Sequence, residues 1–470
     1  MQDNLIAEPA AVTHLRSAFA GTDKLAVAGA VPAKYWGDWS TMPHVRPLAL
    51  VLPRSTEDVA IATRICNRHG QPLAVQGGMT GLAGAATPRS GEIAISLERL
   101  TGIIEIDAAS ATLTALAGTP LQLVQQAAHD AGFHCGIDLG ARGSCTIGGN
   151  AATNAGGTQV LRYGMARRNI LGLEAVLADG TVVSSLNKML KNNAGYDWTQ
   201  LLIGSEGTLG IITRVVVQLQ PRQRAVASAM LEVPDFDAAL KVLRRTEVLR
   251  PGALLSFEAM WPDFHQFAVH HFALSAPLPD SGHLWLLVDF ETAEGHTGAN
   301  EFFDLVSQLF EEGLITNAAI AKSMADRDRF WAIRESPAEY SRVLPGLISF
   351  DVSLPLGKMS AIVEALRRTL LTRWPTATAL FFGHVADSNL HLVMHVPDAP
   401  AATKAAVEDT VYGMVAAHGG SVSAEHGIGQ LKLRYLGHSR SPTELALMRR
   451  IKEALDPRGI LTPGRVLCSS

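Results

Sequence analysis

Short apolar runs separated by polar and glycine-rich connections occupy the first half of the chain. Ser55 and Asp58 form a capping-box pattern that predicts a helix over 56–69, and a second helix is expected from 119 to 132. Asp179 and Gly180 predict a two-residue hairpin turn. The runs predicted as strands are 47–53, 73–76, 93–97, 103–107, 113–117 and 211–219. Residues 46–222 are therefore expected to form one domain, after a weakly patterned N-terminal segment over 1–45.

The pattern changes after Pro221 to longer alternating units. Strands are predicted at 226–234, 254–260, 283–290, 347–354 and 380–385, and helices at 235–249, 299–312, 359–373 and 443–455. Strands and helices that alternate in this way predict an antiparallel sheet with helices packed on one face. A second domain is expected over 223–430, and the fold class of the whole chain is α+β.

Composition narrows the possible functions without naming one. With 470 residues, two or three domains are expected, and a net charge of −4 argues against a nucleic-acid partner. The four cysteines contain no Cys-x-x-Cys pair, which argues against iron–sulfur and zinc-ribbon sites and fits a reducing compartment. Neither a signal peptide nor a transmembrane segment is recognisable, so a cytoplasmic protein is expected, either free or peripheral at the inner face of the membrane.

One stretch, 139–164, is too rich in small residues for an ordinary helix or strand. It reads LGARGSCTIGGNAATNAGGTQVLRYG and contains seven glycines. Glycine lets the backbone approach a ligand closely, and successive free N–H groups form anion-binding concavities. A large, flat ligand is therefore expected against this stretch, and the alternative is a long ordered loop without a ligand.

Two further glycine-rich segments follow the same logic. The strand over 73–76 runs directly into GGMTGLAG at 77–84, and IGSEGTLG occupies 203–210. A strand that enters a glycine-rich turn can hold a pyrophosphate on backbone N–H groups. The first segment alone is a weak signal, because it lacks the G-x-G-x-x-G spacing, and it gains weight from the stretch at 139–164.

Histidine and glutamate residues gather in two short segments of the second half, FGHVADSNLH at 382–391 and SAEHGIG at 423–429. His384 and His391 flank a tight polar turn, so both imidazoles could face one point, and Glu425 could add a carboxylate. Two histidines and one carboxylate leave open positions on a divalent metal. The alternative is that these histidines serve the core or the turn.

The sequence GSCTIGGNAATNAGG, with LRYG, GLEAVLADG and IGSEGTLGIIT after it, resembles the FAD-binding domain of flavoenzymes of the vanillyl-alcohol oxidase type. Within that family the chain is similar to the D-2-hydroxy-acid dehydrogenases, from about residue 47 to 467. The resemblance implies a two-domain α+β flavoprotein with an FAD-binding domain and an α+β substrate (cap) domain. It also implies that the last segment, 431–470, returns to the FAD-binding domain.

The same resemblance implies a set of cofactor-binding residues. The loop at 77–84 contains no His or Cys, so non-covalent FAD is expected. Met79 stands where the family more often has glycine, and Glu206 could instead be a solvated loop carboxylate. The expected FAD-binding residues are Gln76, Gly77, Gly78, Met79, Thr80, Gly81, Leu82, Leu139, Gly143, Ser144, Ile147, Gly148, Gly149, Ala152, Asn154, Gly156, Glu206, Gly207, Gly210, Ile211, Ile212 and Asn389.

By resemblance, the two His/Glu segments match the metal and catalytic motifs of this group. The metal ligands would be His384, His391 and Glu425, with zinc favoured and manganese as the alternative. His426 would be the general base, and Asn389 would contact substrate or flavin. The chemistry implied is oxidation of a D-2-hydroxy acid to a 2-oxo acid, with hydride transfer to flavin N5.

Substrate size is inferred from a third segment, FWAIRE at 330–335. Arg334 matches the family residue that binds a substrate carboxylate, although a surface salt bridge with Glu335 or Glu339 is the alternative. The D-2-hydroxyglutarate branch uses a threonine and a lysine where this chain has Ala338 and Ser349. A monocarboxylate such as D-lactate is therefore favoured, with Ser349 at the substrate's distal end. D-2-hydroxyglutarate or D-malate is the alternative.

Two rival functions stay open at this point. An oxygen-using oxidase of sugars or aromatic alcohols would usually carry covalent flavin and lack the His/Glu set, and a flavin subunit of a glycolate-oxidase-type complex would need an iron–sulfur partner. The electron acceptor could be an electron-transfer flavoprotein, a cytochrome or a quinone, and a homodimer is compatible with the sequence.

Overall fold

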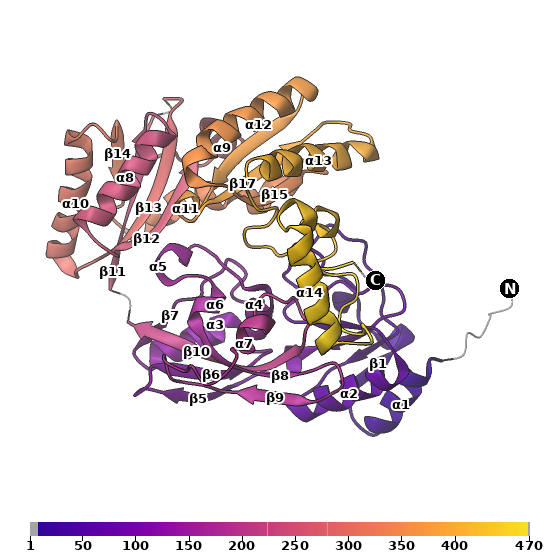
Figure 1. Cartoon of the computed structure of the whole chain (residues 1–470). Coiled ribbons are helices and arrows are strands. Elements are labelled where there is room, and N and C mark those ends of the chain that lie inside the picture. Colours follow the sequence, from indigo (N-terminus) through magenta and orange to yellow (C-terminus); the bar gives the residue numbers. More distant parts are fainter. Residues whose placement is uncertain (1–7, 223, 280, 469–470) are drawn as a thin grey trace. The chain divides into compact units, whose positions relative to one another are not determined.

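The computed structural model describes residues 8–222, 224–279 and 281–468, which divide into two compact units (Figure 1). Unit 1 contains the chain up to Gly157, the span Gly164–Arg222 and the C-terminal segment from Glu425. Unit 2 contains Thr158–Tyr163 and Gln223–Ala424. Both units mix helices and sheets, which confirms the predicted α+β class.

The first sheet of unit 1 carries the strand that leads into the glycine loop at 77–84. Its strand order is β1 (Leu25–Val27), β2 (Ala49–Val51), β4 (Ile93–Ser96) and β3 (Leu73–Gln76). The strands β2 and β3 run parallel to β4, and β1 is antiparallel to β2. Helix α2 (Thr56–His69) begins with the predicted capping box of Ser55 and Asp58 and packs against α1 (Ala10–Ala18).

The second sheet of unit 1 is antiparallel, and its strand β10 (Ile211–Pro221) packs against helix α4 (Ile147–Thr153) of the glycine-rich stretch. Its strands are β5 (Ile103–Asp107), β6 (Thr112–Leu116), β10, β8 (Ile170–Val176) and β9 (Val182–Ser185), with β7 (Phe133–Cys135) paired to the end of β10. Helices α3 (Leu121–Asp130), α4, α6 (Ala166–Asn169) and α7 (Thr199–Leu202) belong to the same unit. One continuous apolar core joins both sheets, through residues such as Val51, Ile95 and Val215.

The C-terminal segment, from Glu425 onwards, is part of unit 1 and pairs with its first sheet. Helix α14 (Pro442–Leu455) starts at a capping box of Ser441 and Glu444. Leu461 forms a parallel bridge with Leu73 of β3. The segment therefore completes the same sheet that carries the glycine loop after β3.

Unit 2 is built on a seven-stranded antiparallel sheet. The strand order is β14 (Asn317–Ile320), β11 (Ala225–Val233), β13 (Leu284–Thr292), β12 (Leu254–Met260), β16 (Thr378–Gly383), β17 (Asn389–His395) and β15 (Ile348–Ser353). Its helices are α5 (Val160–Tyr163), α8 (Phe236–Leu249), α9 (Pro262–His271), α10 (Gly295–Glu311), α11 (Met324–Glu335), α12 (Met359–Arg373) and α13 (Ala401–Ala417).

Helices cover both faces of this sheet, so the prediction of helices on one face is wrong. Phe381 and Phe382 are neighbours in β16 and point to opposite faces. Phe382 stacks on Phe264 of α9 with ring centroids 4.4 Å apart, whereas the guanidinium of Arg367 in α12 lies over the ring of Phe381. The sequence pattern did not reveal α9 or α11, which lie on the Phe382 face and contribute Phe264 and Ile333 to its core.

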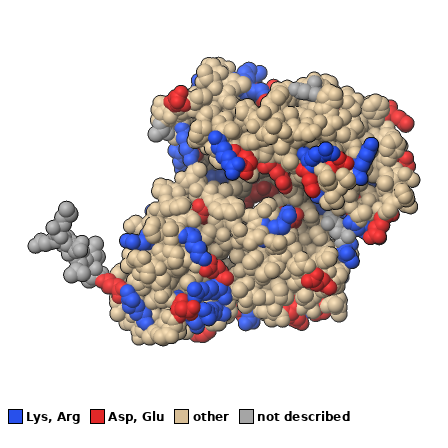
Figure 2. All heavy atoms as spheres, turned by 180° about the vertical axis from the view of Figure 1, so that it is seen from behind, with Lys and Arg blue, Asp and Glu red and all other residues tan. Residues whose placement is uncertain are grey.

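Charged side chains of both signs are interspersed over the face drawn in Figure 2. Ion pairs also link neighbouring helices of unit 2: Arg245 of α8 pairs with Glu312 at the end of α10, and Arg250 at the end of α8 pairs with Glu301 of α10. Among residues 8–222, 224–279 and 281–468, no helix combines the length and apolar composition needed to cross a membrane.

Candidate active site

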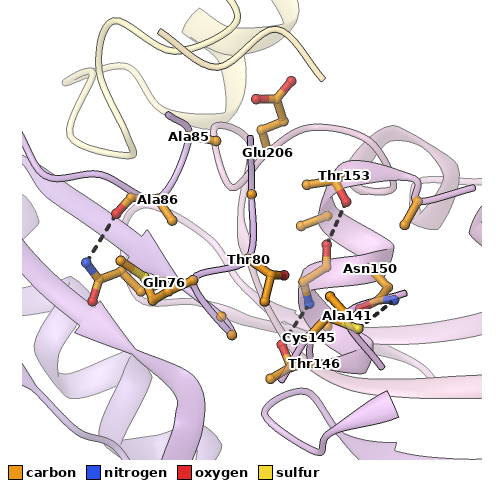
Figure 3. Close-up of a pocket in the computed structure, with 18 of the residues that line it drawn as sticks. Gln76, Thr80, Ala85, Ala86, Ala141, Cys145, Thr146, Asn150, Thr153 and Glu206 are labelled. Atoms are coloured by element: carbon orange, nitrogen blue, oxygen red, sulfur yellow. Dashed lines mark hydrogen bonds between the residues drawn. The ribbon is translucent and has the colours of Figure 1, made fainter. Parts of the chain in front are cut away.

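A cavity of about 450 Å³ lies within unit 1 (Figure 3). Its size is typical of small-molecule sites. Chain segments that are distant in sequence line it: the loop after β3, the stretch at 139–156, the third glycine-rich segment and the start of the C-terminal segment. The three glycine-rich segments singled out from the sequence thus meet at one place.

The loop after β3 forms one wall because Gly78 allows a very close approach. A Cβ atom on Gly78 would lie 2.0 Å from the carbonyl oxygen of Ser144, so no larger residue fits without moving one of the two segments. Met79 has φ 58°, a left-handed conformation that is uncommon for non-glycine residues. Gln76 anchors the start of the loop, since its side-chain amide donates to the carbonyl oxygens of Tyr35 and Ala86 at 2.9 and 3.1 Å.

Helix α4 and its flanks form the opposite wall. The hydroxyl of Thr146 caps the helix by accepting a hydrogen bond from the Gly149 N–H. A Cβ atom on Gly148 would lie 2.4 Å from Cβ of Ala117, and one on Gly157 would lie 1.9 Å from the carbonyl oxygen of Asp138. Close packing between chain segments therefore explains why some positions of this stretch are glycine, independently of a ligand.

Most of the predicted cofactor residues line the cavity. They are Gln76, Gly77, Gly78, Met79, Thr80, Gly81, Leu82, Leu139, Gly148, Gly149, Ala152, Gly156, Glu206, Gly207, Gly210 and Ile212. The remaining members in unit 1 are not among its lining residues: Gly143, Ser144, Ile147, Asn154 and Ile211. Ile147 and Ile211 are fully buried in the core instead. Asn154 uses its side-chain oxygen to accept from the N–H of Arg167 at 2.9 Å.

Other residues that line the cavity were not in the predicted set of cofactor-binding residues. They are Trp39, Val75, Ala85, Ala86, Leu97, Gly140, Ala141, Cys145, Thr146, Asn150, Thr153 and Ala155. Those between 140 and 155 belong to the singled-out stretch, so treating the whole stretch as the site would have included them. Burial raises the pKa of the Cys145 thiol, and the Asn150 side-chain amide lies 3.6 Å from its sulfur.

Two carboxyl groups and one imidazole also line the cavity, those of Glu206, Glu425 and His426. A carboxylate oxygen of Glu425 accepts a hydrogen bond from the N–H of Gly157 at 3.0 Å. Glu206 is buried and accepts from two backbone N–H groups, which contradicts the alternative of a solvated loop carboxylate. Burial raises the pKa of Glu206 above its usual value, despite the lowering effect of those two hydrogen bonds.

Unit 2 brings His384 and His391 together. Their ring centroids are 5.3 Å apart with a T-shaped arrangement. The tight turn between β16 and β17 places them, with Ser388 in the left-handed region at φ 73°. The two imidazole rings are therefore close neighbours. His391 is also 4.0 Å from the Asp351 carboxylate, measured from Nδ1.

Glu258 of β12 links His384 to Arg334. One carboxylate oxygen lies 2.6 Å from Nδ1 of His384, and the other accepts from Nε of Arg334 at 2.7 Å. Burial alone would raise the pKa of Glu258, but the charges of His384 and Arg334 outweigh burial and hold that pKa well below its usual value. Arg334 is buried, so the alternative of a surface salt bridge with Glu335 or Glu339 is wrong.

Sequence reasoning missed Glu258. The sequence could have indicated it only through its position, because Glu258 is an acidic residue inside the otherwise largely apolar strand LLSFEAM. A charged side chain that is buried in such a strand requires a partner.

Asn389 lies beside these residues on the same face of the sheet, because it is two positions before His391 in β17. It is 3% exposed, and within the described part of the chain neither atom of its side-chain amide has a hydrogen-bond partner. A buried, unpaired amide costs free energy unless a ligand satisfies it. This observation fits the predicted contact with substrate or flavin.

The other residues considered for substrate size are exposed. Ser349 lies on β15, on the same face as Asp351, and Ala338 lies in the short 3-10 helix Ser336–Arg342 after α11.

Glu425 and His426 open the C-terminal segment of unit 1, directly after Ala424 of unit 2. The N–H of Ala424 lies 3.4 Å from the carbonyl oxygen of Asp351, the strand neighbour of His391.

Two family models match the chain. Residues 47–185 match an FAD binding domain, and residues 222–466 match the C-terminal domain of FAD linked oxidases. A mitochondrial D-2-hydroxyglutarate dehydrogenase from Bos taurus is 38% identical over 431 residues, covering 92% of this chain and 78% of the relative. A D-2-hydroxyglutarate dehydrogenase from Xanthomonas citri pv. viticola is 36% identical over 439 residues, which cover 92% of this chain and 92% of the relative.

A Schizosaccharomyces pombe protein, provisionally named a mitochondrial D-lactate dehydrogenase, is 33% identical over 91% of this chain and 83% of its own length.

Solved structures show the same fold at low sequence identity. p-Cresol methylhydroxylase superposes with a TM-score of 0.76 at 18% identity, over 97% of this chain and 96% of the other. An alkyldihydroxyacetonephosphate synthase superposes with a TM-score of 0.73 at 17% identity, over 98% of this chain and 86% of the other. The chain therefore belongs to the family of FAD-linked oxidases with a fold of the vanillyl-alcohol oxidase type, and it is an FAD-dependent oxidoreductase in the group of the D-2-hydroxy-acid dehydrogenases.

Proposed function

We propose that the protein oxidises a D-2-hydroxy acid to the corresponding 2-oxo acid, using non-covalently bound FAD and a divalent metal. The observation that carries this proposal is the glycine-lined cavity of unit 1, which has His426 on its wall. The names of the relatives support the class of substrate.

The cavity suits FAD held without a covalent bond. Its walls are mainly small residues, and Gly78 and Gly148 bring backbone segments closer than any side chain would permit. The thiol of Cys145 lines the cavity, but burial raises its pKa and so keeps it in the unreactive protonated form. Acid precipitation should therefore release the flavin into solution.

The donor set of unit 2 suits a metal held by His384 and His391, with Glu425 as the third ligand and zinc favoured over manganese. Metal-ligating histidines commonly direct their second ring nitrogen to a carboxylate, as His384 does towards Glu258. The nitrogen that this leaves, Nε2, lies 3.4 Å from Nη2 of Arg334. The proposed metal ligand His384 and the proposed carboxylate-binding guanidinium of Arg334 are thus neighbours.

Protein groups then have separable roles in the reaction. Arg334 would bind the substrate carboxylate, Asn389 would hydrogen-bond substrate or flavin, and His426 would take the hydroxyl proton as general base. Bound FAD and metal supply hydride acceptance at N5 and polarisation of the hydroxyl oxygen. Glu258 would hold both Arg334 and His384 in place during these events.

A monocarboxylic substrate, D-lactate or a slightly longer analogue, is favoured by the surroundings of Arg334. Ala338 and Ser349 provide no cation for a second carboxylate. Lys322 precedes α11, which begins at Met324, and Arg334 lies near the end of that helix, so about 15 Å of helix rise lies between them. Arg342 is exposed and already paired with Glu339.

D-2-hydroxyglutarate or D-malate is the second candidate, because relatives at 36–38% identity are named for D-2-hydroxyglutarate. The electron acceptor would be an electron-transfer flavoprotein, a cytochrome or a quinone. The four cysteines are free thiols, which fits the proposed cytoplasmic location, whereas some relatives are named as mitochondrial.

The test is a substrate panel with an artificial dye as electron acceptor. It compares both enantiomers of lactate and 2-hydroxybutyrate with D-2-hydroxyglutarate and D-malate. The expected result is turnover of D-enantiomers, with kcat/KM higher for D-lactate or D-2-hydroxybutyrate than for the dicarboxylates. A preference for D-2-hydroxyglutarate would establish the second candidate, and the absence of turnover with every D-2-hydroxy acid would contradict the proposed function.

A further inference from the structure

Glu206 connects two parts of unit 1 that are more than two hundred residues apart in sequence. One carboxylate oxygen accepts from the N–H of Ile428 at 2.8 Å, and the other accepts from the N–H of Gly429, also at 2.8 Å. The two donors belong to the segment that carries Glu425 and His426. In Figure 3 the carboxylate of Glu206 points away from Thr80, towards the pale yellow ribbon of the C-terminal segment.

The backbone of Glu206 is fixed to the cavity wall. Its N–H donates to the carbonyl oxygen of Ala152 at 2.8 Å, and the N–H of Gly204 donates to Ala151 at 3.0 Å. Both acceptors are in helix α4. Glu206 also has φ 53°, a left-handed conformation that the surrounding contacts must hold. The carboxylate is therefore presented from a rigid base.

The segment from 425 to 429 is folded closely around this carboxylate. Gly427 has φ 78°, and a Cβ atom there would lie 2.7 Å from Oε1 of Glu206. Gly429 has φ 49°, and a Cβ atom there would lie 2.1 Å from the carbonyl oxygen of Ala83. A larger residue at either position would push the segment off the cavity wall.

We propose that Glu206 is a positioning residue whose carboxylate fixes the 425–429 segment against α4 and so sets the place of His426 in the cavity. This inference rests on the proposed role of His426 as general base. Both carboxylate oxygens are engaged by the backbone of this segment, so Glu206 acts on the reaction through His426 and not as a direct ligand of FAD. Two N–H donors meet the two acceptor oxygens of one side chain, so the contact fixes both the place and the orientation of the segment.

The test uses Glu206→Gln in the holoenzyme. Glutamine has the same size but offers one acceptor oxygen, and its NH₂ group would face the second backbone N–H. Hydrogen–deuterium exchange at the amides of Ile428 and Gly429 should speed up by about tenfold or more, the scale expected for one charged hydrogen bond. The FAD content should stay near that of wild type, while kcat for the best D-2-hydroxy acid falls at least about tenfold with little change in KM.

Asp456→Asn is the matched control. Asp456 is also buried and also accepts from two backbone N–H groups, those of Ile460 and Leu461 at 3.0 and 2.8 Å, but it does not line the cavity. This variant should speed exchange at 460–461 and lower the Tm while leaving kcat and exchange at 428–429 unchanged. If Glu206→Gln fails to fold, Gly427→Ala tests the same contact from the other side, with the same expected effects.

Two results separate the inference from the proposed function. Unchanged exchange at 428–429 in Glu206→Gln, or a kcat loss no larger than that of Asp456→Asn, would overturn the positioning role. Faster exchange at 428–429 together with full activity of His426→Gln would leave the contact standing and reject His426 as the general base.

Discussion

At the scale of single residues, the sequence indicated the groups with chemical character but not the partners that hold them. Arg334, His384 and His391 stand in recognisable motifs, and the structure brings all three to one face of the unit 2 sheet. Glu258 is 76 residues before Arg334 and 126 before His384. Only the pairing of β12 with β16 places it beside them, and no local pattern reports such a pairing.

Glu258→Gln should weaken metal binding by about 10–100-fold, the usual effect of removing a carboxylate behind a metal-ligating histidine. The measurement is zinc and manganese titration against a competing chelator. Asp289→Asn is the control, because Asp289 is also a buried carboxylate. It accepts hydrogen bonds from Arg327 and Trp331 of α11, the helix that carries Arg334, but not from Arg334 or His384 themselves. Equal affinities for wild type and Glu258→Gln, or an equal loss in Asp289→Asn, would reject this role.

At the scale of elements, the capping pattern was sufficient to predict α2 but not α11, although the Ser323 hydroxyl caps α11 by accepting a hydrogen bond from the Asp326 N–H. The Ser55 and Asp58 capping box is confirmed at α2. Helix α11 presents Arg327, Trp331 and Arg334 to buried carboxylates, so it lacks the apolar stripe that reveals an amphipathic helix.

Local turn geometry was also only partly predictable. The predicted two-residue turn at Asp179 and Gly180 is wrong, because Leu177 pairs with Thr181 around a three-residue loop. Gly180 has φ 84° there, as a glycine bulge requires.

The glycine loop after β3 gives a prediction at the same scale. Gly78→Ala should yield protein with far less bound FAD, since its Cβ would lie 2.0 Å from the carbonyl oxygen of Ser144 and must displace one wall of the cavity. Gly437→Ala, in unit 1 but not among the residues that line the cavity, adds a Cβ with nothing within 4 Å and should keep its flavin. Flavin absorbance per mole of purified protein checks this, and equal flavin content in both variants would contradict it.

At the scale of the whole molecule, the sequence was sufficient for the family and the α+β class, because long ungapped motifs span both halves of the chain. The path of the chain is less predictable. Thr158–Tyr163 belongs to unit 2 although the stretch on either side belongs to unit 1, and Glu425 returns the chain to unit 1. The proposed ligands and base are consequently shared by two units, so activity should require the intact chain.

The most direct test of the account is to mix the enzyme rapidly with D-lactate in the absence of oxygen. The absorbance of the flavin then reports how fast the substrate reduces it. The account predicts that the flavin band bleaches with D-lactate and not with L-lactate. Bleaching should slow by at least about 100-fold in His426→Ala, the scale of a positioned general base, and a metal-free sample should be slow until zinc or manganese is restored. A flavin that stays oxidised with every D-2-hydroxy acid, or that bleaches equally fast without His426 and without metal, would contradict it.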